Sequence, residues 1–229
     1  MASPGGSSGY GSPKAAETYS TYLPHCVRFF YATRIVLRKH SVQASHPLQT
    51  ALEQYRVAVT APHVDSTGSG IDDWEKLVQD SGDRLETLLH DANLHDPIAV
   101  LLPETATLQL TDGGGSMTQV IPNLWLGDSR VLLGDGPRAL AQQNITHICW
   151  CCSQLQPRHG YTEMFKYSHI PVIDSDRANI ARYFWKTNAF IEEGIDAGGG
   201  VLVLCESGIS ASAAVTVAYL MQTARLTTA

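Results

Sequence analysis

The sequence lacks any apolar run close to the ~20 residues that a helix needs to cross a bilayer. Its first residues, MASPGGSSGYGSPKAAE, also lack the basic-then-apolar order of a secretory signal. We therefore expect no membrane partner and predict a cytoplasmic or nuclear protein.

Basic residues are in the minority. The chain has 16 Lys and Arg against 22 Asp and Glu, which gives a formal charge of -6. Such a chain has no broad attraction to nucleic acid, so no nucleic-acid partner is expected. One basic stretch, at Arg34, Arg38, Lys39 and His40, could dock an acidic partner surface, but we interpret it as a solvated helix face.

Cysteine is scarce as well. The five cysteines are Cys26, Cys149, Cys151, Cys152 and Cys205. An odd number without regular spacing does not form a disulfide framework, which is typical of a reducing compartment. Thiol chemistry at one of them therefore remains open.

Several of these cysteines lie near histidines, in the set His147, Cys149, Cys151, Cys152 and His159. Alternate residues of a strand project to opposite faces, so Cys149 and Cys151 would share one face and Cys152 would take the other. Such side chains do not converge on one tetrahedral ion. We interpret them as core residues and predict no metal site and no cofactor.

Composition divides the chain into four parts. Residues 1–19 are rich in Gly, Ser, Pro and Ala and are predicted to be a disordered tail. Residues 20–111 are predicted to form a mainly helical segment of no recognisable family. The run at 112–117 is the clearest linker, and it precedes a second domain at 118–229.

Within the first segment, the spacing of apolar residues predicts helices over 22–40 and 72–90. Residues 61–70 are expected to be a loop. The stretch 98–110 is expected to hold one or two short strands, interrupted by Pro103.

The second domain alternates apolar strands with helices, which indicates an α/β fold with a mostly parallel central sheet flanked by helices. The predicted strands are 120–127, 147–152, 166–173 and 201–204, and the predicted helices are 180–195 and about 210–223.

The last of these strands ends at Cys205 and leads through Glu-Ser-Gly-Ile-Ser into a helix. Backbone N–H groups at a helix start, together with the helix dipole, attract an anion and lower the pKa of a cysteine. Gly208 allows the loop to curl tightly, and the Ser210 and Ser212 hydroxyls can donate hydrogen bonds to a thiolate. This combination is suited to phosphate chemistry.

Longer stretches carry a resemblance to a known family. Residues 170–221, from IPVID through VLVLCESGISAS to YLM, resemble the middle of dual-specificity protein phosphatases, which carry His-Cys-x-x-Gly-x-Ser-Arg-Ser in the loop. VIPNLWLGDSR at 120–130 is similar to the opening strand of that family, and NITHICWCC at 144–152 is similar to its second strand. The resemblance covers roughly residues 119–226.

The resemblance implies a role for each matching position. Cys205 would be the nucleophile, Asp174 the general acid, with Asp176 next in line, and Ser212 the hydroxyl that assists breakdown of a cysteinyl-phosphate. The phosphate-binding loop would comprise Glu206, Ser207, Gly208, Ile209, Ser210 and Ala211.

Two positions depart from the family pattern. Leu204 replaces the histidine that keeps the thiol ionised, and Ala211 replaces the arginine that grips two phosphate oxygens. Arg177 or Arg182 could in principle substitute, but nothing in the sequence places either over a phosphate. The chain also ends at LTTA, so we expect the domain to lack the usual final helices.

We therefore predict a phosphatase-fold protein with impaired or lost activity, that is, a pseudophosphatase that binds a phosphorylated or signalling protein, for which a kinase is one candidate. The alternative is a slow protein tyrosine/serine/threonine phosphatase. A sulfurtransferase is a weaker option, because Ser210 stands where the rhodanese pattern Cys-x-x-Gly-x-Arg has its arginine. The sequence does not indicate an oligomeric state.

Overall fold

The computed structural model describes residues 13–40, 46–60, 71–102, 107–110, 114–153, 163–173 and 178–224. The chain forms two compact units, Met1–Leu102 and Pro103–Ala229, each of which is considered by itself. The boundary therefore falls at Pro103, before the glycine-rich run at 112–117 where we predicted a linker.

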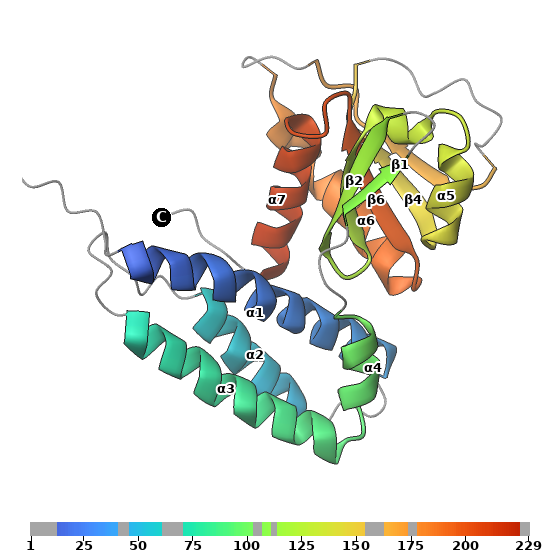
Figure 1. Ribbon diagram of the computed structural model, residues 1–229. Coiled ribbons are helices and arrows are strands. Elements are labelled where there is room, and N and C mark those ends of the chain that lie inside the picture. Colours follow the sequence, from blue (N-terminus) through green and yellow to red (C-terminus); the bar gives the residue numbers. More distant parts are fainter. Residues whose placement is uncertain are drawn as a thin grey trace, which may run out of the picture. The chain divides into compact units, whose positions relative to one another are not determined.

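The first unit consists of helices, as predicted (Figure 1). They are α1 (Pro13–Lys39), α2 (His46–Thr60), α3 (Ile71–Asp91) and α4 (His95–Val100). The predicted disordered tail of 1–19 was wrong in part, because α1 already begins inside it. The predicted strand region 98–110 is confirmed at Thr107–Leu110, whereas α4 occupies its start. Helix α2 was not predicted. Residues 1–12 and the predicted loop 61–70 lie outside the described residues.

Aromatic side chains connect the helices of this unit. The ring of Phe29 in α1 meets the ring of Tyr55 in α2 edge to face, with 5.4 Å between centroids. Trp74 in α3 is buried, and its indole Nε1 donates a hydrogen bond of 3.1 Å to the carbonyl of Ala58 in α2. A buried indole N–H needs such a partner, so this bond fixes α3 against α2.

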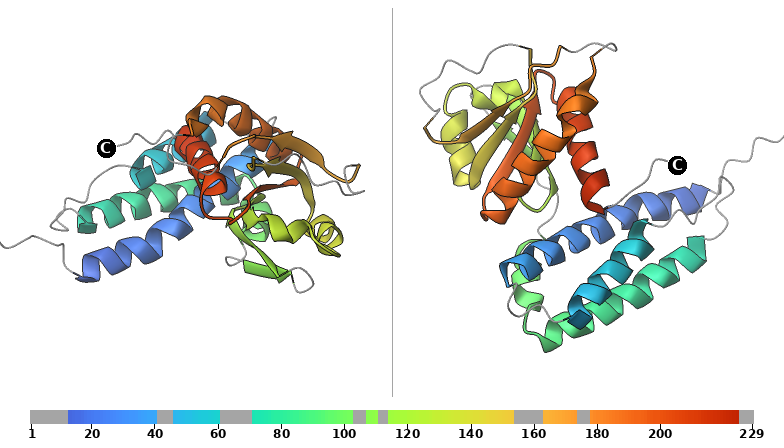
Figure 2. Two further views of the ribbon diagram at one scale, coloured as in Figure 1. Left: turned by 90° about the horizontal axis from the view of Figure 1, so that it is seen from above. Right: turned by 180° about the vertical axis from the view of Figure 1, so that it is seen from behind.

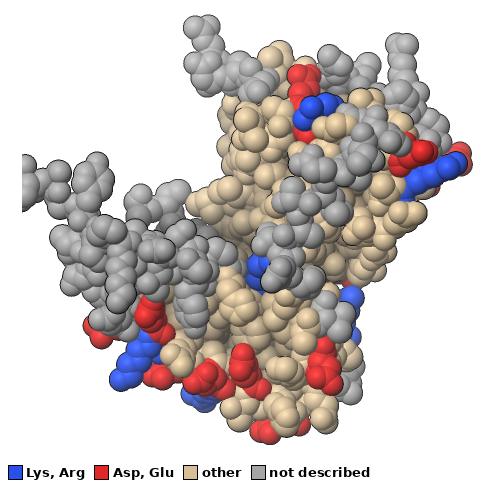
Figure 3. Space-filling model, viewed as in Figure 1, with Lys and Arg blue, Asp and Glu red and all other residues tan. Residues whose placement is uncertain are grey.

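The outer side of α3 is acidic (Figure 3). Its exposed acidic residues are Asp73, Asp80, Asp83, Glu86 and Asp91. The basic stretch expected at the end of α1 includes Arg38, Lys39 and His40, which are exposed, and Arg34, which is half-buried.

The second unit contains a six-stranded sheet in the order β1-β2-β3-β6-β4-β5. The strands are β1 (Thr107–Leu110), β2 (Gly115–Ile121), β3 (Leu124–Asp128), β4 (Ile145–Trp150), β5 (Lys166–His169) and β6 (Gly200–Cys205). The β1–β2 and β2–β3 pairs are antiparallel, whereas the pairs formed by β3, β6, β4 and β5 are parallel. The predicted mostly parallel α/β fold is confirmed.

Helices cover this sheet (Figures 1 and 2). They are α5 (Gly136–Gln142), α6 (Phe184–Asp196) and α7 (Ala211–Ala224), with short 3-10 helices η1 (Ser129–Leu132) and η2 (Ile180–Tyr183). Helices α6 and α7 pack on each other and on β6, and α5 packs on β4. Every residue of β6 is buried, as expected for a central strand that is covered on both faces.

The glycine-rich run forms part of this sheet. Residues 115–117, which we predicted to belong to a linker at 112–117, lie in β2, and the sheet includes β1 upstream of the predicted domain start at 118. Gly114 has a φ of 64°, a turn conformation that glycine adopts without strain. A turn into a strand, rather than a flexible connection, is therefore the structural role of Gly114.

The strand predicted at 120–127 is also two strands. The chain reverses between β2 and β3, where Asn123 takes a φ of 63°, which asparagine tolerates better than most residues. The other predicted strands and helices occur with shifted ends: the strand predicted at 166–173, for example, stops at His169.

Candidate functional site

Cys205 lies at the carboxyl end of the central strand β6. Its neighbours in the adjacent strand β3 are in register, with Asp128 opposite Cys205 and Gly127 opposite Leu204. On the other side, Leu204 is opposite Trp150 of β4. Main-chain hydrogen bonds on both sides therefore fix the position of the cysteine. Leu204 is fully buried, so a core side chain occupies the position of the family's histidine.

The loop after Cys205 curls tightly before α7 begins. Gly208 has a φ of 76°, and a Cβ placed on it would lie 3.1 Å from the backbone nitrogen of Asp128. Both the turn and the close approach to β3 therefore require glycine. The backbone N–H of Ala214 donates to the carbonyl of Ser210 at 3.0 Å, which marks the first turn of α7.

The loop directs donors toward the cysteine sulfur. The Ser212 hydroxyl oxygen lies 3.0 Å from Sγ, the Gly208 N–H donates to Sγ at 3.2 Å, and the Ser207 hydroxyl lies 3.8 Å away. Burial alone would raise the pKa of Cys205, but hydrogen bonds from Ser212, the Ser210 backbone and Ser207 outweigh it and lower the pKa to about 7. A large share of Cys205 is therefore a thiolate at neutral pH.

Two neighbouring thiols have raised rather than lowered pKa values. A hydrogen bond with Cys149 and burial raise the pKa of Cys151, and burial raises the pKa of Cys152 to about 12. The sulfurs of Cys149 and Cys151 are 3.8 Å apart, and all three of these cysteines are buried. The lowered pKa therefore distinguishes Cys205 from Cys151 and Cys152, and its role as a nucleophile stays a prediction.

A cavity of about 240 Å³ opens beside the thiol. Its lining consists of Cys151, Cys152, Ser153, Val172, Ile173, Cys205, Glu206 and Ala211. The Ala211 side chain therefore forms part of the cavity wall. None of the described residues in this lining is basic, and one of them, Glu206, is acidic.

A second cavity, of about 390 Å³, shares Val172 and Ile173 with the first. Arg182 lies in its lining, with its guanidinium 4.6 Å from the centre of the Tyr183 ring, and it also donates a hydrogen bond to the Tyr183 hydroxyl. This guanidinium is therefore engaged outside the cavity that contains Cys205.

The remaining predicted site residues are placed as follows. Glu206, Ser207 and Ile209 are exposed, Gly208 and Ser210 are half-buried, and Ala211 and Ser212 are buried. The proposed general acid Asp174, its alternative Asp176 and Arg177 lie outside the described residues, and so does His159.

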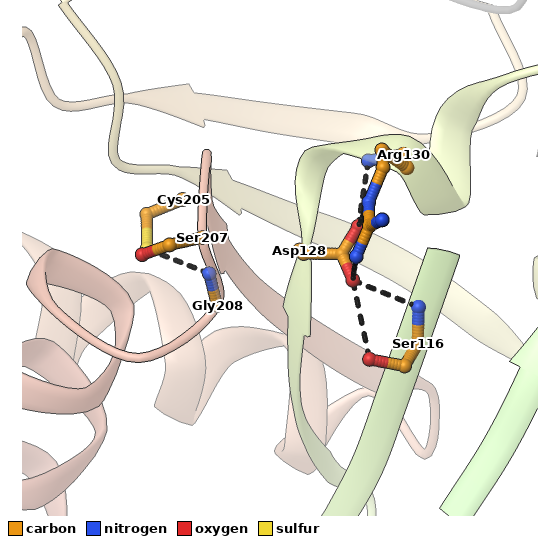
Figure 4. Close-up of polar contacts among 6 residues, drawn as sticks. All are labelled: Ser116, Asp128, Arg130, Cys205, Ser207 and Gly208. Carbon is orange, nitrogen blue, oxygen red and sulfur yellow. Dashed lines mark hydrogen bonds and ion pairs between the residues drawn. The ribbon is translucent and has the colours of Figure 1, made fainter. Parts of the chain in front are cut away.

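The sequence analysis missed Asp128. Its carboxylate accepts hydrogen bonds from the Ser116 backbone N–H at 2.9 Å, the Ser116 hydroxyl at 3.1 Å, the Arg130 backbone N–H at 2.9 Å and the Arg130 guanidinium at 3.1 Å. Figure 4 shows this carboxylate pointing away from Cys205 toward Ser116 and Arg130. Burial would raise the pKa of Asp128, but these hydrogen bonds lower it. The one sequence signal was an acidic residue directly at a strand end.

Across the described parts of the chain, no group of three or more His, Cys, Asp or Glu side chains is arranged to hold a metal ion. Of the helices that the structure describes, none combines the length and apolar character of a membrane span.

Comparison with known proteins agrees with this geometry. Residues 124–229 match the family model described as the dual specificity phosphatase catalytic domain. A probable dual specificity protein phosphatase of Dictyostelium discoideum is 39% identical over 106 residues, which span 46% of this chain and 25% of that protein. Dual specificity protein phosphatase 1B of Arabidopsis thaliana is 34% identical over 119 residues, or 52% of this chain and 69% of that protein.

A third relative is the human serine/threonine/tyrosine-interacting protein, 32% identical over 110 residues that span 47% of this chain and 49% of that protein. A crystal structure of that human protein, described as tyrosine phosphatase-like, is also similar, with 32% identity and a TM-score of 0.45. The match spans 48% of this chain and 76% of the chain in that crystal structure. The matched stretch is thus only part of each relative. Together with the cysteine loop, the match to the family model and to these relatives shows that the chain belongs to the dual specificity phosphatase family.

Proposed function

We propose that this protein is a phosphatase-like module that binds phosphorylated or signalling proteins and whose phosphatase activity is impaired or lost. The proposal rests on Ala211, which lines the cavity beside Cys205. At this position the family has the arginine that binds phosphate. No described lining residue replaces that positive charge.

The binding energy that an arginine would contribute is large enough for its absence to favour impaired turnover. An arginine that grips two phosphate oxygens makes two charge-assisted hydrogen bonds, each worth ~1.5–3 kcal/mol, and these strengthen as charge develops in the transition state. In other phosphoryl-transfer enzymes a catalytic arginine contributes ~10³–10⁵ in rate. Alanine donates no hydrogen bond, so neither contribution is available from position 211.

What the site retains supports a binding role. The backbone of the loop and the start of α7 still present N–H groups, as the contact from Gly208 to Sγ illustrates, and such groups attract anions. The human relative carries a name that describes interaction with serine, threonine and tyrosine rather than hydrolysis. A phosphorylated signalling protein, such as a kinase in the cytoplasm or nucleus, is the partner class that we propose.

A weakly active phosphatase is the second candidate. The low pKa of Cys205 and the Ser212 hydroxyl 3.0 Å from its sulfur favour it, because both serve a cysteinyl-phosphate mechanism. In that mechanism Sγ would attack phosphorus while Asp174 protonates the departing oxygen, and water would then release phosphate from the cysteine.

Hydrolysis of p-nitrophenyl phosphate by the purified full chain tests the proposal. We expect no activity above that of the matched Cys205→Ser variant, which retains the loop but lacks the nucleophile. Robust hydrolysis that disappears in Cys205→Ser and in Asp174→Ala would overturn the proposal in favour of the second candidate, and trapping of a phosphocysteine by rapid acid quench would confirm that outcome.

A further inference from the structure

The described lining of the cavity beside Ala211 includes a cysteine and an acidic residue. These residues are Cys205, whose pKa is lowered to about 7, and Glu206. None of the described lining residues is basic. A phosphate entering this cavity would therefore meet like charges that no described lining side chain offsets.

Two described arginines near this site, Arg130 and Arg182, are engaged elsewhere. Arg130 forms an ion pair with Asp128, with Nε 3.1 Å from the carboxylate, and Figure 4 shows this pair directed away from Cys205. Arg182 stacks over the Tyr183 ring in the second cavity and hydrogen-bonds its hydroxyl. Moving either guanidinium into the first cavity would break these contacts.

We propose that the cavity beside Ala211 is a receptor for a guanidinium group supplied from outside this chain, by an arginine side chain of the phosphorylated partner. The ligand is thus a phosphosite that carries its own arginine within reach. The proposal about the ligand depends on the proposed function, because it assumes that the site binds phosphorylated proteins.

A guanidinium suits this cavity better than an ammonium does. It is planar and weakly hydrated, so its faces can lie against apolar walls, and Val172 and Ile173 provide such walls. Its edge carries donors in a fixed fork, which can bridge the Glu206 carboxylate and the oxygens of a phosphate held above Cys205. Phosphoryl-transfer proteins are known to receive a catalytic arginine in trans.

The first experiment tests the guanidinium site without any phosphate. The pKa of Cys205 is measured from the pH profile of thiolate absorbance, with Cys205→Ser as the blank, in methylguanidinium chloride at low, non-denaturing concentration and in sodium chloride of equal ionic strength. A bound cation stabilises the thiolate, so we expect methylguanidinium to lower this pKa further. An equal pKa in the two salts would overturn the proposal.

Two variants of position 211 serve as matched controls. Ala211→Met fills the cavity with an uncharged side chain, and Ala211→Arg supplies a guanidinium from within the chain. Both should abolish the response to methylguanidinium, and circular dichroism confirms that each is folded. If folded Ala211→Met responds as strongly as the natural protein, the cation binds somewhere else and the proposal is wrong.

The second experiment identifies the ligand. Two phosphotyrosyl peptides are compared by fluorescence anisotropy, one with arginine near the phosphotyrosine and the other with citrulline, an uncharged analogue of the same shape. We expect the arginine peptide to bind the natural protein roughly tenfold more tightly or better. This preference should persist in Cys205→Ser and disappear when Ala211→Arg is added to Cys205→Ser, a background that cannot hydrolyse the peptides.

The outcomes separate the two proposals. Equal binding of both peptides would contradict the proposal that the ligand carries its own arginine, but it would not contradict phosphosite binding. Binding of neither peptide, with the methylguanidinium response preserved, would refute phosphosite binding and retain the guanidinium receptor.

Discussion

The sulfur of Cys205 lies 3.0 Å from the hydroxyl oxygen of Ser212, which sits in the first turn of α7. This contact joins the end of the central strand to the start of the helix that follows it. It also supplies the leading hydrogen bond among those that lower the pKa of the thiol. The hydrogen bonds that favour the thiolate are therefore present in a loop that has alanine at position 211.

The first prediction concerns this contact. Ser212→Ala should raise the pKa of Cys205 above its value of about 7, because the thiolate loses its closest hydroxyl donor. Thiolates react with iodoacetamide and thiols do not, so alkylation rises as the pH rises through the pKa. The midpoint of this pH profile should shift upward in the variant.

Ser207→Ala is the matched control, since its hydroxyl lies 3.8 Å from the sulfur and its removal should move the midpoint less. Mass spectrometry should locate the label on Cys205 and not on Cys151 or Cys152, whose pKa values are raised. An unchanged midpoint in Ser212→Ala would show that the backbone alone ionises the thiol.

The second prediction restores the family arginine. Ala211→Arg should increase kcat/KM for p-nitrophenyl phosphate by ~10³–10⁵, because a guanidinium at this position lines the cavity that contains Cys205. Adding Leu204→His should not be required, since hydrogen bonds already lower the pKa of Cys205.

Ala211→Gln is its control, because glutamine has length and donors but no charge. Equal gains in the two variants would mean that a filled cavity, rather than a positive charge, limits turnover. A folded Ala211→Arg variant that binds vanadate but hydrolyses nothing would locate the defect elsewhere.

The third prediction concerns the Asp128 carboxylate. Asp128→Ala should lower the free energy of unfolding of this unit by about 1–3 kcal/mol, because it leaves partly buried donors of Ser116 and Arg130 without their acceptor. Arg130→Ala should cost less than about 1 kcal/mol, since the Arg130 side chain is 58% exposed and its backbone N–H still binds Asp128. Urea unfolding followed by circular dichroism measures both changes.

The same carboxylate gives a pH dependence. The pKa of Asp128 is lowered from 3.8 in the folded state, so its stabilising contribution is complete above pH 3.8 and is lost as the pH falls through the lower folded value. The stability difference between the natural protein and Asp128→Ala should therefore shrink in strong acid. If the stability difference between the two proteins does not change with pH, Asp128 does not stabilise the fold through its ionised form.

The fourth prediction compares two glycines with positive φ. Gly114→Ala should cost about 1 kcal/mol, because its φ of 64° is strained for alanine but its surroundings are open. Gly208→Ala should cost more and should also raise the pKa of Cys205, since the added Cβ would press on the backbone of Gly127 and Asp128 at 3.1 Å. Equal costs would show that the loop can shift away from β3.

The sequence predicted the cysteine loop well because its information is local. A strand, a short loop with Gly208 and a helix follow one another between Gly200 and Ala224, so spacing alone places Cys205 close to a helix start. The role of Asp174 stays a prediction, because that residue lies outside the described part of the chain.

Features that depend on distant partners were missed. The partner of Asp128 at Ser116 is twelve positions away on another strand, and the pairing of β1 with β2 turned an apparent linker into part of the sheet. Helix α2 was overlooked although its buried residues Leu48, Ala51, Tyr55 and Ala58 follow helical spacing, because the window is short and carries several polar residues.

The placement of position 211 has a functional consequence. Ala211 contributes to the wall of a cavity, whereas the fold around it depends on main-chain pairing of β3, β4 and β6 and on buried side chains of the strands. Alanine in place of arginine here removes hydrogen-bond donors for phosphate, but it does not remove a contact on which the sheet depends. Under the proposed function, a substitution at this position would change turnover while the folded module that binds its partner stays intact.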